Sequence, residues 1–298
     1  MQYVATLISD PAVEPLDPGL AAEASAALAD TGATVAAADW LAPSRACDLA
    51  FTGADPTSAL AAIRGAIGGR PIDAAVLPVA GRRKRLLISD MDSTIITNET
   101  LDDLAEYAGV GAEVTAITWQ SMRGEIEFVE ALETRVAMLQ GLPAAMLEVA
   151  FRQVVLMPGA QTLVRTLRQH GVHTVLVSGG FKYFTTRVAR MVGFEEEQAN
   201  ELEVAYGWLT GKVVPPIINR DGKVDALVRI SEQKGIDIAD TMAVGDGAND
   251  LGMIARAGLG VGFRCKRIVA EHAAVRIDHS DLTALLFIQG YRAEDFAR

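Results

Sequence analysis

The sequence is poor in cysteine and has no long apolar run, and these absences exclude several classes of protein. Only two of its 298 residues are cysteines, Cys47 and Cys265, which lie far apart and in no metal-ligand spacing. This excludes a disulfide scaffold and a cysteine-based zinc site, and it predicts a reducing, cytoplasmic location. No run of about 18 apolar residues occurs, and no basic region precedes an apolar stretch near the N-terminus, so we expect neither a membrane span nor a secretion signal.

Basic residues are also scarce. The chain has 27 Lys and Arg against 38 Asp and Glu, which gives a net charge of −11. A general nucleic-acid binder needs a basic face, so we expect no nucleic-acid partner. Hydrophobic residues make up 50% of the chain. That is enough for a sizeable core and excludes a mainly disordered protein.

Lysine is absent from the first 80 residues, which hold nine acids against three arginines. The remaining residues carry 29 acids and 24 bases, so most of the charge imbalance lies in the first block. Between the two blocks lies the basic run Gly81–Arg85, which we interpret as a solvated linker rather than a binding patch. These shifts predict one domain over residues 1–80 and a second over residues 81–298.

The first block has the element order of a small α+β domain. Helical segments at 18–29 and 55–67 begin beside Asp17 and Asp55, two good helix-capping residues. β-prone runs lie before, between and after these helices, at 3–8, 33–38, 48–52 and 72–78. The βαββαβ order predicts a ferredoxin-like sandwich. No catalytic or metal-binding constellation occurs in this block, so regulation, dimerisation and a purely structural role all stay open.

From residue 85 onward, short apolar runs alternate with longer helical patterns, which is typical of an α/β domain with a mainly parallel sheet. The expected strands are 85–89, 172–177, 241–244 and 259–263, with helices at 161–169 and 224–233 and a hairpin around 202–216. A helical stretch over 100–153 separates the first two strands. It exceeds an ordinary crossover connection and predicts a cap inserted at about 98–155.

Polar side chains follow three of these expected strands. Asp90 and Asp92 follow the first, Ser178 and two glycines follow the second, and the segment 245–250 follows the third. Because ligands bind at the carboxyl ends of parallel strands, we expect these groups to meet at one edge of the sheet. They would offer oxygens to a hard divalent cation, and a hydroxyl and amides to a phosphate. Lys223, which begins the helix before the third strand, would neutralise that phosphate.

The motifs DMDST (90–94), VSGG (177–180), Lys223 and GDGAND (245–250) stand in this order and resemble the four motifs of the haloacid dehalogenase-like phosphatases. Over residues 85–290 the chain resembles phosphoserine phosphatases in particular. The resemblance implies a Rossmann-like parallel sheet with an inserted helical cap. The first block resembles the ACT-like domains that some members carry, in strand order and length.

The resemblance also implies a reaction, the Mg²⁺-dependent hydrolysis of O-phospho-L-serine to L-serine and phosphate. Asp90 would be the nucleophile that forms an aspartyl-phosphate, and Asp92 the general acid and then the base. Mg²⁺ would be held by four residues: Asp90, Asp92 through its backbone carbonyl, Asp246 and Asp250. The phosphoryl oxygens would be bound by a second set: Ser178, Gly179, Lys223 and Asn249.

Specificity is expected in the cap, because phosphoserine offers an ammonium and a carboxylate besides its phosphate. The resemblance implies that Glu99 binds the ammonium and that Arg135, with its planar guanidinium, binds the carboxylate. Phe128 lies seven residues before Arg135, so the two would share one helix face. The residues alone favour a simpler interpretation, in which Phe128 is ordinary cap core and the two charges form a surface ion pair.

Three alternatives stay open at this point. The same chemistry could act on another small phosphomonoester, or it could transfer the phosphoryl group to an alcohol. The chain could instead be a non-catalytic sensor whose first block binds serine. A homodimer through the N-terminal domain is a further expectation. The three tryptophans, Trp40, Trp119 and Trp208, are expected in core or hairpin packing.

Overall fold

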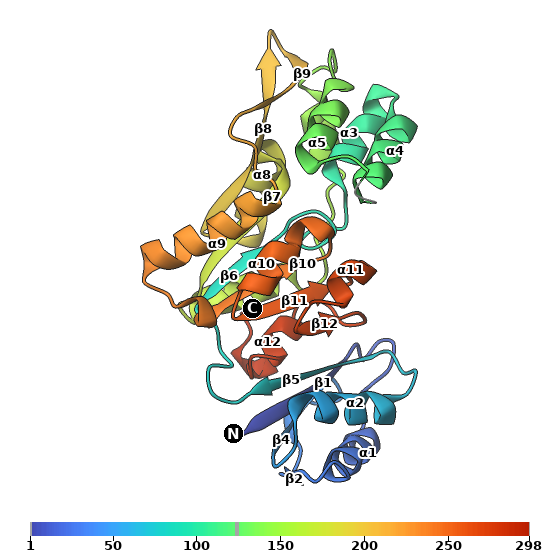
Figure 1. Cartoon of the computed structure of the whole chain (residues 1–298), viewed down its shortest axis with the longest axis vertical. Coiled ribbons are helices and arrows are strands. Elements are labelled where there is room, and N and C mark those ends of the chain that lie inside the picture. Colours follow the sequence, from blue (N-terminus) through green and yellow to red (C-terminus); the bar gives the residue numbers. More distant parts are fainter. Residues whose placement is uncertain (1, 123–124, 298) are drawn as a thin grey trace.

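The computed structural model describes residues 2–122 and 125–297, and Figure 1 shows a small N-terminal unit below a larger sheet with a helical insert above it. The small unit contains, in chain order, β1 Tyr3–Ser9, α1 Pro18–Ala29, β2 Thr34–Val35, β3 Asp39–Ala42, β4 Ala46–Thr52, α2 Pro56–Ile67 and β5 Ile72–Pro78. Its strand order is β2-β4-β1-β5, and β1 pairs antiparallel with both β4 and β5. This is the predicted ferredoxin-like topology, with β3 as an additional strand beside β4.

The two helices of this unit begin where the sequence indicates. Asp17 accepts a hydrogen bond from the Leu20 amide, and Asp55 accepts one from the Ser58 amide. A proline is the first residue of each helix, a position where the missing N–H costs nothing.

The larger unit is built on a seven-stranded sheet in the order β12-β11-β10-β6-β7-β8-β9. Its strands are β6 Leu86–Ser89, β7 His173–Phe181, β8 Glu196–Ala205, β9 Trp208–Val214, β10 Thr241–Gly245, β11 Leu259–Phe263 and β12 Val275–Ile277. All neighbouring pairs are parallel except β8 with β9, as the mainly parallel prediction requires. The accompanying helices are α7 Ala160–Gln169, α8 Lys182–Val192, α9 Arg220–Lys234, α10 Leu251–Arg256, α11 Arg267–Ala270 and α12 Ala284–Phe287.

The order of the strands reverses at β6. From β6 the chain proceeds to β7 and β8 on one side and returns to β10 on the other side. The carboxyl ends of β6 and β10 therefore form a topological switch point, the place where open α/β sheets bind ligands.

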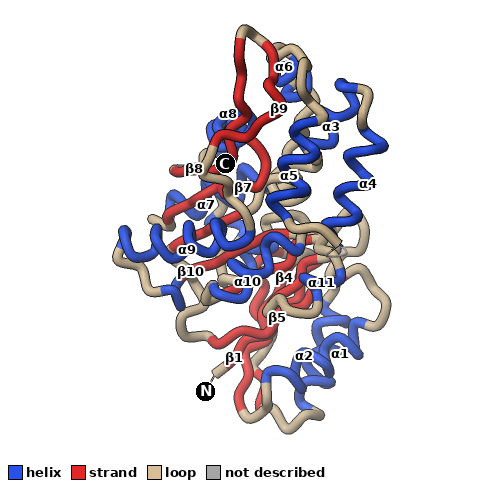
Figure 2. Tube along the Cα trace, turned by 45° about the horizontal axis from the view of Figure 1, so that its top comes forward, coloured by secondary structure: helices blue, strands red, loops and turns tan. Residues whose placement is uncertain are grey.

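The predicted insert between β6 and β7 is helical. It contains α3 Thr100–Ala108, α4 Gly111–Met122, α5 Phe128–Ala137 and α6 Met146–Phe151. The chain enters and leaves the insert side by side, because Ile96 and Leu156 pair in an isolated antiparallel bridge. The β8–β9 hairpin turns at Tyr206 and Gly207 and packs against α5, as Figures 1 and 2 both show.

The N-terminal sheet is covered on both faces, so it forms a wall shared by the two units. Leu7 and Ala74 point into the core that contains α1 and α2. Their neighbours Ile8 and Ala75 belong to the core of the larger unit. This division follows from the alternation of side chains along a strand.

Arg82 in the linker is mostly shielded from solvent, so the interpretation of the basic run as a solvated linker was wrong for this residue. Its side chain is 13% exposed and donates to both carboxylate oxygens of Asp48, at 2.6 and 2.8 Å. It also donates to the carbonyl oxygens of Phe287 and Ile288. All these partners are distant in the sequence, so the run itself gave no sign of them. Arg82 joins the two units.

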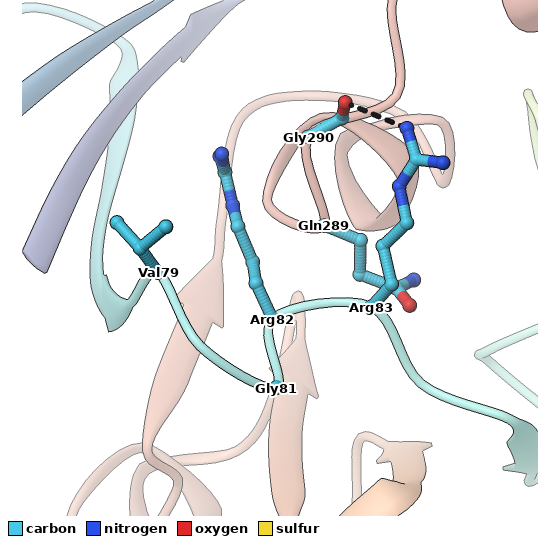
Figure 3. Close-up of a pocket in the computed structure, with 6 residues that line it drawn as sticks. All are labelled: Val79, Gly81, Arg82, Arg83, Gln289 and Gly290. Atoms are coloured by element: carbon cyan, nitrogen blue, oxygen red, sulfur yellow. Dashed lines mark hydrogen bonds between the residues drawn. The ribbon is translucent and has the colours of Figure 1, made fainter.

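Arg83 lies beside it at the surface. It donates to the Gly290 carbonyl oxygen at 3.2 Å in an open hollow next to the linker (Figure 3). Its guanidinium carbon lies 4.2 Å from the centroid of the Tyr291 ring. Of these two neighbouring arginines, one thus lies inside the junction and the other lies on its surface.

Acids of the lysine-free block supply further contacts across the junction. The Asp73 carboxylate is buried and accepts hydrogen bonds from three consecutive amides, those of Asp278, His279 and Ser280. Asp39 pairs with Arg292 at 2.7 Å on the surface. Part of the negative charge of the first block is therefore used to bind the larger unit.

Within residues 2–122 and 125–297, no helix is both long enough and apolar enough to cross a membrane.

The buried Arg82 pair provides a stability test. Arg82→Met leaves the Asp48 carboxylate buried without its cation, so we expect the free energy of unfolding to fall by about 3–5 kcal/mol. Urea denaturation followed by circular dichroism measures this loss. Arg292→Met is the matched control, because its pair with Asp39 is exposed and solvent screens it. Equal losses in the two variants would show that Arg82 is not the anchor of the junction.

Candidate active site

A cavity of about 580 Å³ lies between the edge of the sheet and the inserted helices. Of the residues singled out from the sequence, nine line it: Asp90, Asp92, Glu99, Phe128, Arg135, Ser178, Gly179, Asp246 and Asn249. The other two, Lys223 and Asp250, are fully buried and in contact with Asp90 or its neighbours. The structure therefore brings the whole set together.

Three adjacent strands position the polar groups on the floor of the cavity. Asp90 directly follows β6, the middle strand, and its amide donates to the Val244 carbonyl oxygen of β10. Asp246 follows β10. Ser178 differs from expectation, because β7 continues to Phe181 and Ser178 lies within the strand. The pairing of β7 with β8 becomes irregular after Val177.

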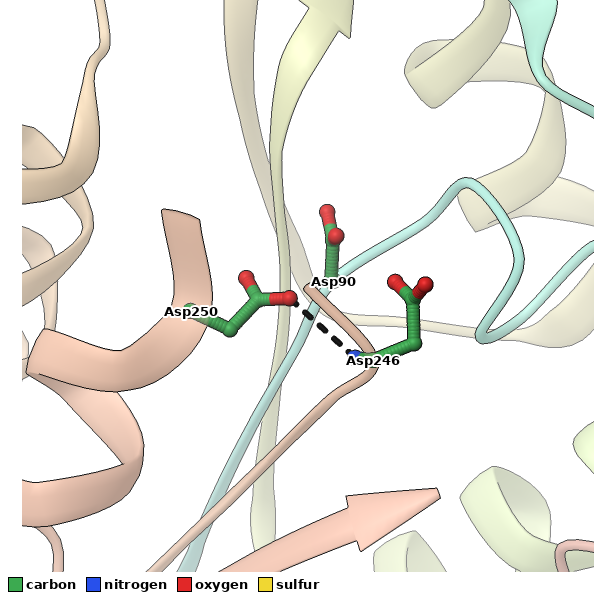
Figure 4. Close-up of side chains that lie close together, drawn as sticks. All are labelled: Asp90, Asp246 and Asp250. Atoms are coloured by element: carbon green, nitrogen blue, oxygen red, sulfur yellow. Dashed lines mark hydrogen bonds between the residues drawn. The ribbon is translucent and has the colours of Figure 1, made fainter. Parts of the chain in front are cut away.

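Three carboxylates gather at this edge. Asp90, Asp246 and Asp250 each place one oxygen within 4.8 Å of the others, and all three are buried (Figure 4). Gly245 makes room for this cluster, since a Cβ at that position would collide with the Asp250 carboxyl group. Burial and the negative charge of Asp90 raise the pKa of Asp250 to about 8. Burial also raises the pKa of Asp246, against the opposing charge of Lys266.

Lys223 partly balances this charge. Its Nζ lies 2.7 Å from Asp90 Oδ1 and 2.7 Å from Asp250 Oδ1. Burial acts to lower the pKa of Lys223, but the charges of Asp250 and Asp90 outweigh it, so the pKa is raised and the ammonium stays charged. One ammonium cannot neutralise three buried carboxylates. The remaining oxygens are the hard ligands that a divalent cation prefers, so the donor set fits such an ion.

Asp92 has a partner for each of its carboxylate oxygens. The Thr100 amide donates to Oδ1 at 2.9 Å, and the Ser178 hydroxyl donates to Oδ2 at 3.2 Å. Burial and the charge of Asp90 raise the pKa of Asp92 to about 6. A carboxyl group with such a pKa can both give and accept a proton near neutral pH.

The inserted helices supply the other wall of the cavity. Glu99 accepts a hydrogen bond from the Ser93 hydroxyl at 2.7 Å and is open to solvent at the cavity. The surrounding protein still partly desolvates its carboxylate, and this together with the charge of Asp92 raises its pKa to about 7. Arg135 donates to the Thr118 hydroxyl at 3.1 Å. Burial lowers the pKa of Arg135, while the charges of Asp102 and Glu99 act to raise it.

Phe128 and Arg135 both line the cavity from α5, as their seven-residue spacing requires. The Phe128 ring lies directly over Gly179, where a Cβ would be 3.2 Å from the ring. A larger residue at Gly179 would therefore push the insert away from the sheet.

The residues that line the cavity but were not selected from the sequence include Lys266, Arg220 and Trp119. Lys266 Nζ lies 3.4 Å from Asp246 Oδ2, and Lys266 follows the predicted strand at 259–263. Asp90 was selected because it follows an expected strand, and the same reasoning applied to 259–263 would have selected Lys266. The prediction that Trp119 packs in a core was wrong, since it lies on α4 and is 58% exposed. Nothing in its local sequence distinguishes a core tryptophan from one at a cavity mouth.

Comparison with known proteins agrees with this geometry. The family model for haloacid dehalogenase-like hydrolases matches residues 87–255. Phosphoserine phosphatase SerB2 of Mycobacterium tuberculosis is 44% identical over 212 residues, which cover 71% of this chain and 52% of that protein. This chain thus spans about half the length of that relative. A phosphoserine phosphatase of Streptococcus thermophilus is 43% identical over 205 residues, which cover 69% of this chain and 95% of that protein.

The similarity extends to structure over nearly the whole chain. The crystal structure of a HAD family hydrolase from Salmonella enterica serovar Typhi aligns with a TM-score of 0.85 at 26% sequence identity. The alignment covers 97% of this chain and 98% of the other, so it includes the N-terminal unit. The chain belongs to the haloacid dehalogenase-like hydrolases, in the same family as the phosphoserine phosphatases.

Proposed function

We propose that this chain is a Mg²⁺-dependent phosphatase that hydrolyses O-phospho-L-serine to L-serine and phosphate. The observation that carries the proposal is the buried Asp90 carboxylate, held 2.7 Å from Lys223 at the floor of the cavity, with Asp92 two residues further along. The two relatives described above are phosphoserine phosphatases by name, which supports the choice of substrate.

Asp90 is the nucleophile in the first step. One of its carboxylate oxygens attacks phosphorus, the bond from phosphorus to the serine oxygen breaks, and an aspartyl-phosphate forms. Lys223 Nζ lies 2.7 Å from Asp90 Oδ1 and gives the buried nucleophile a counter-ion. The Ser178 hydroxyl, the Gly179 amide, Lys223 and Asn249 bind the phosphoryl oxygens, because donors fixed in advance stabilise the charge that moves onto them.

Asp92 moves the protons in both steps. Its carboxylic acid protonates the serine oxygen as that oxygen leaves, which avoids release of an alkoxide. The resulting carboxylate then takes a proton from a water molecule, whose oxygen attacks the phosphorus of the aspartyl-phosphate. Phosphate departs and the Asp90 carboxylate is restored.

The carboxylate cluster fits Mg²⁺. Asp90, Asp246 and Asp250, with the Asp92 backbone carbonyl, would supply the protein oxygens. The bound ion would offset the repulsion between these carboxylates and the phosphate dianion.

Glu99 and Arg135 select the amino acid part of the substrate. Glu99 is an acid that already lies at the cavity and can pair with the substrate ammonium. Arg135 on α5 can pair with the substrate carboxylate through its planar guanidinium. Phe128 fixes the distance between α5 and the phosphate site through its contact with Gly179.

The domain division remains our proposal, with boundaries at residues 80/81 and a cap over about 98–155. The Ile96–Leu156 bridge supports the cap limits. A homodimer through the N-terminal unit and a cytoplasmic location stay predictions. In such a dimer the sheet face that contacts the larger unit is already occupied, so the second copy would have to use another surface.

Removal of the nucleophile tests the reaction class. We expect Asp90→Asn to lower phosphate release from O-phospho-L-serine by about 10⁴-fold or more, because no other group can form the covalent intermediate. Asp225→Asn, an exposed change on α9 away from the cavity, is the control and should keep full activity. A serine-binding sensor without catalytic activity would show no phosphate release in the wild-type chain either.

Metal binding can be measured without turnover. In thermal unfolding, Mg²⁺ at a hundred times its Kd should stabilise the wild-type chain by about 2.7 kcal/mol. Asp246→Asn should unfold at an equal or higher temperature than wild type without Mg²⁺, because one buried carboxylate is gone, and it should not respond to added Mg²⁺. Full activity of wild type in EDTA would contradict the metal requirement.

Arg135 tests the substrate assignment. Loss of a charge-assisted hydrogen bond in Arg135→Ala should lower kcat/KM for O-phospho-L-serine by about 100-fold. O-phosphoethanolamine lacks the carboxylate, so its turnover should change little. Arg152→Ala, an exposed change in the same insert, is the matched control. Equal effects on both substrates, or a strong preference of wild type for a sugar phosphate, would overturn phosphoserine as substrate but leave the mechanism intact.

A further inference from the structure

Thr100 has a polar group whose role the proposed reaction does not explain. It is the first residue of α3 and is 1% exposed. Its hydroxyl is buried and makes no hydrogen bond of good geometry among the described residues, yet the side chain interacts with the Asp92 carboxylate and acts to lower the pKa of that group. A buried hydroxyl without a well-formed hydrogen bond costs stability, so its presence beside a reactive group calls for a reason.

The N-terminus of α3 is bound by Asp92 rather than by its own capping residue. Glu99 occupies the N-cap position but makes no side-chain hydrogen bond to the helix, and its carboxylate is bound by Ser93 instead. The Asp92 carboxylate accepts from the Thr100 amide at 2.9 Å. The first amides of a helix carry the positive end of its dipole and favour a carboxylate.

The Thr100 hydroxyl lies against the same carboxyl group. A Cβ at Gly180 would be 2.9 Å from Asp92 Oδ2, 3.0 Å from the Ser178 hydroxyl oxygen and 3.4 Å from the Thr100 hydroxyl oxygen. These three groups therefore converge on one glycine. The Ser178 hydroxyl donates to Asp92 and already accepts from the Gly180 amide. Within this group, the Asp92 carboxylate is the acceptor that remains for a hydrogen bond from the Thr100 hydroxyl.

We propose that Thr100 is a positioning residue whose amide and hydroxyl hold the Asp92 carboxyl group in the orientation that delivers a proton to the leaving oxygen. The inference rests on the proposed function only in the role of Asp92 as acid and base. Because α3 is the first helix of the insert, the contact between Thr100 and Asp92 also makes proton transfer depend on how the insert packs on the sheet. Movement of the insert away from the sheet would release Asp92.

Three variants separate the two contacts. Thr100→Val removes the hydroxyl and keeps the shape, whereas Thr100→Ser restores a hydroxyl. Thr100→Pro removes the amide proton as well, at the first helical position, where proline is tolerated. Pro18 and Pro56 already occupy this position in α1 and α2. Glu99 has an extended backbone, with φ −111° and ψ 98°, which lies near the β region that a following proline favours.

With O-phospho-L-serine, we expect Thr100→Val to lose about 5-fold in kcat, the value of one hydrogen bond. Thr100→Pro should lose about 100-fold in kcat, as for a misplaced catalytic group, with KM nearly unchanged. Thr100→Ser should regain most of the wild-type kcat. Thr166→Val is the matched control, because Thr166 is also buried but its hydroxyl binds the Ala297 amide outside the cavity.

An aryl phosphate as substrate distinguishes a positioning role of Thr100 from a merely structural one. The leaving group of p-nitrophenyl phosphate needs no proton, so Thr100→Pro should release the first equivalent of nitrophenolate at about the wild-type rate. The second step still needs Asp92 as base and should be slow, which gives a burst of one nitrophenolate per active site. This burst does not depend on whether phosphoserine is the substrate.

Two results would overturn the inference. One is an unchanged kcat in both Thr100→Pro and Thr100→Val. The other is an equal loss of the first turnover with both substrates and no burst, which would indicate general damage to the site. Circular dichroism reports whether Thr100→Pro keeps its helices. If Thr100→Pro does not fold, the comparison of Thr100→Val with Thr100→Ser decides the question. A loss of kcat in Thr100→Val that Thr100→Ser also shows would contradict the role of the hydroxyl.

Discussion

The double ion pair of Lys223 is the interaction on which the rest of the site depends. Its buried ammonium lies 2.7 Å from both Asp90 and Asp250. Without it, two carboxylates would be buried together at the end of one sheet with no cation beside them, which is costly. With it, both carboxylates share a buried counter-ion. The cluster then still carries excess negative charge, which accounts for its fit to a divalent cation.

The fold places this pair where the geometry is most rigid. Asp90 follows the middle strand of the sheet, Asp250 follows the neighbouring strand β10, and Lys223 projects from the first turn of α9. Catalytic groups that stand on three buried elements keep their distances more closely than groups on loops. The insert adds the residues that recognise the rest of the substrate. Its helices bring Glu99, Phe128 and Arg135 over the same floor, so recognition of the substrate and the chemistry of phosphate are carried by separate pieces of the chain.

The N-terminal unit serves the larger unit in a way that its composition alone did not reveal. This unit has an excess of acids and no catalytic motif. Two of those acids, Asp48 and Asp73, nevertheless bind groups of the larger unit in the buried junction. The alternating residues of its strands supply two cores at once. The ferredoxin-like sheet therefore has one face packed against its own helices and the other packed against the larger unit.

The sequence by itself determined the element order of the first unit, the mainly parallel sheet, the insert and the places of Asp90 and Asp246 at strand ends and of Lys223 at the start of a helix. Those follow from short-range patterns, since side-chain periodicity and strand-end motifs are local properties of the chain. Tertiary structure alone decided which groups touch. The contact of Arg82 with Asp48 and that of Asp92 with the N-terminus of α3 join segments whose distance in space no local pattern specifies. The exposure of Trp119 likewise depends on how the insert packs.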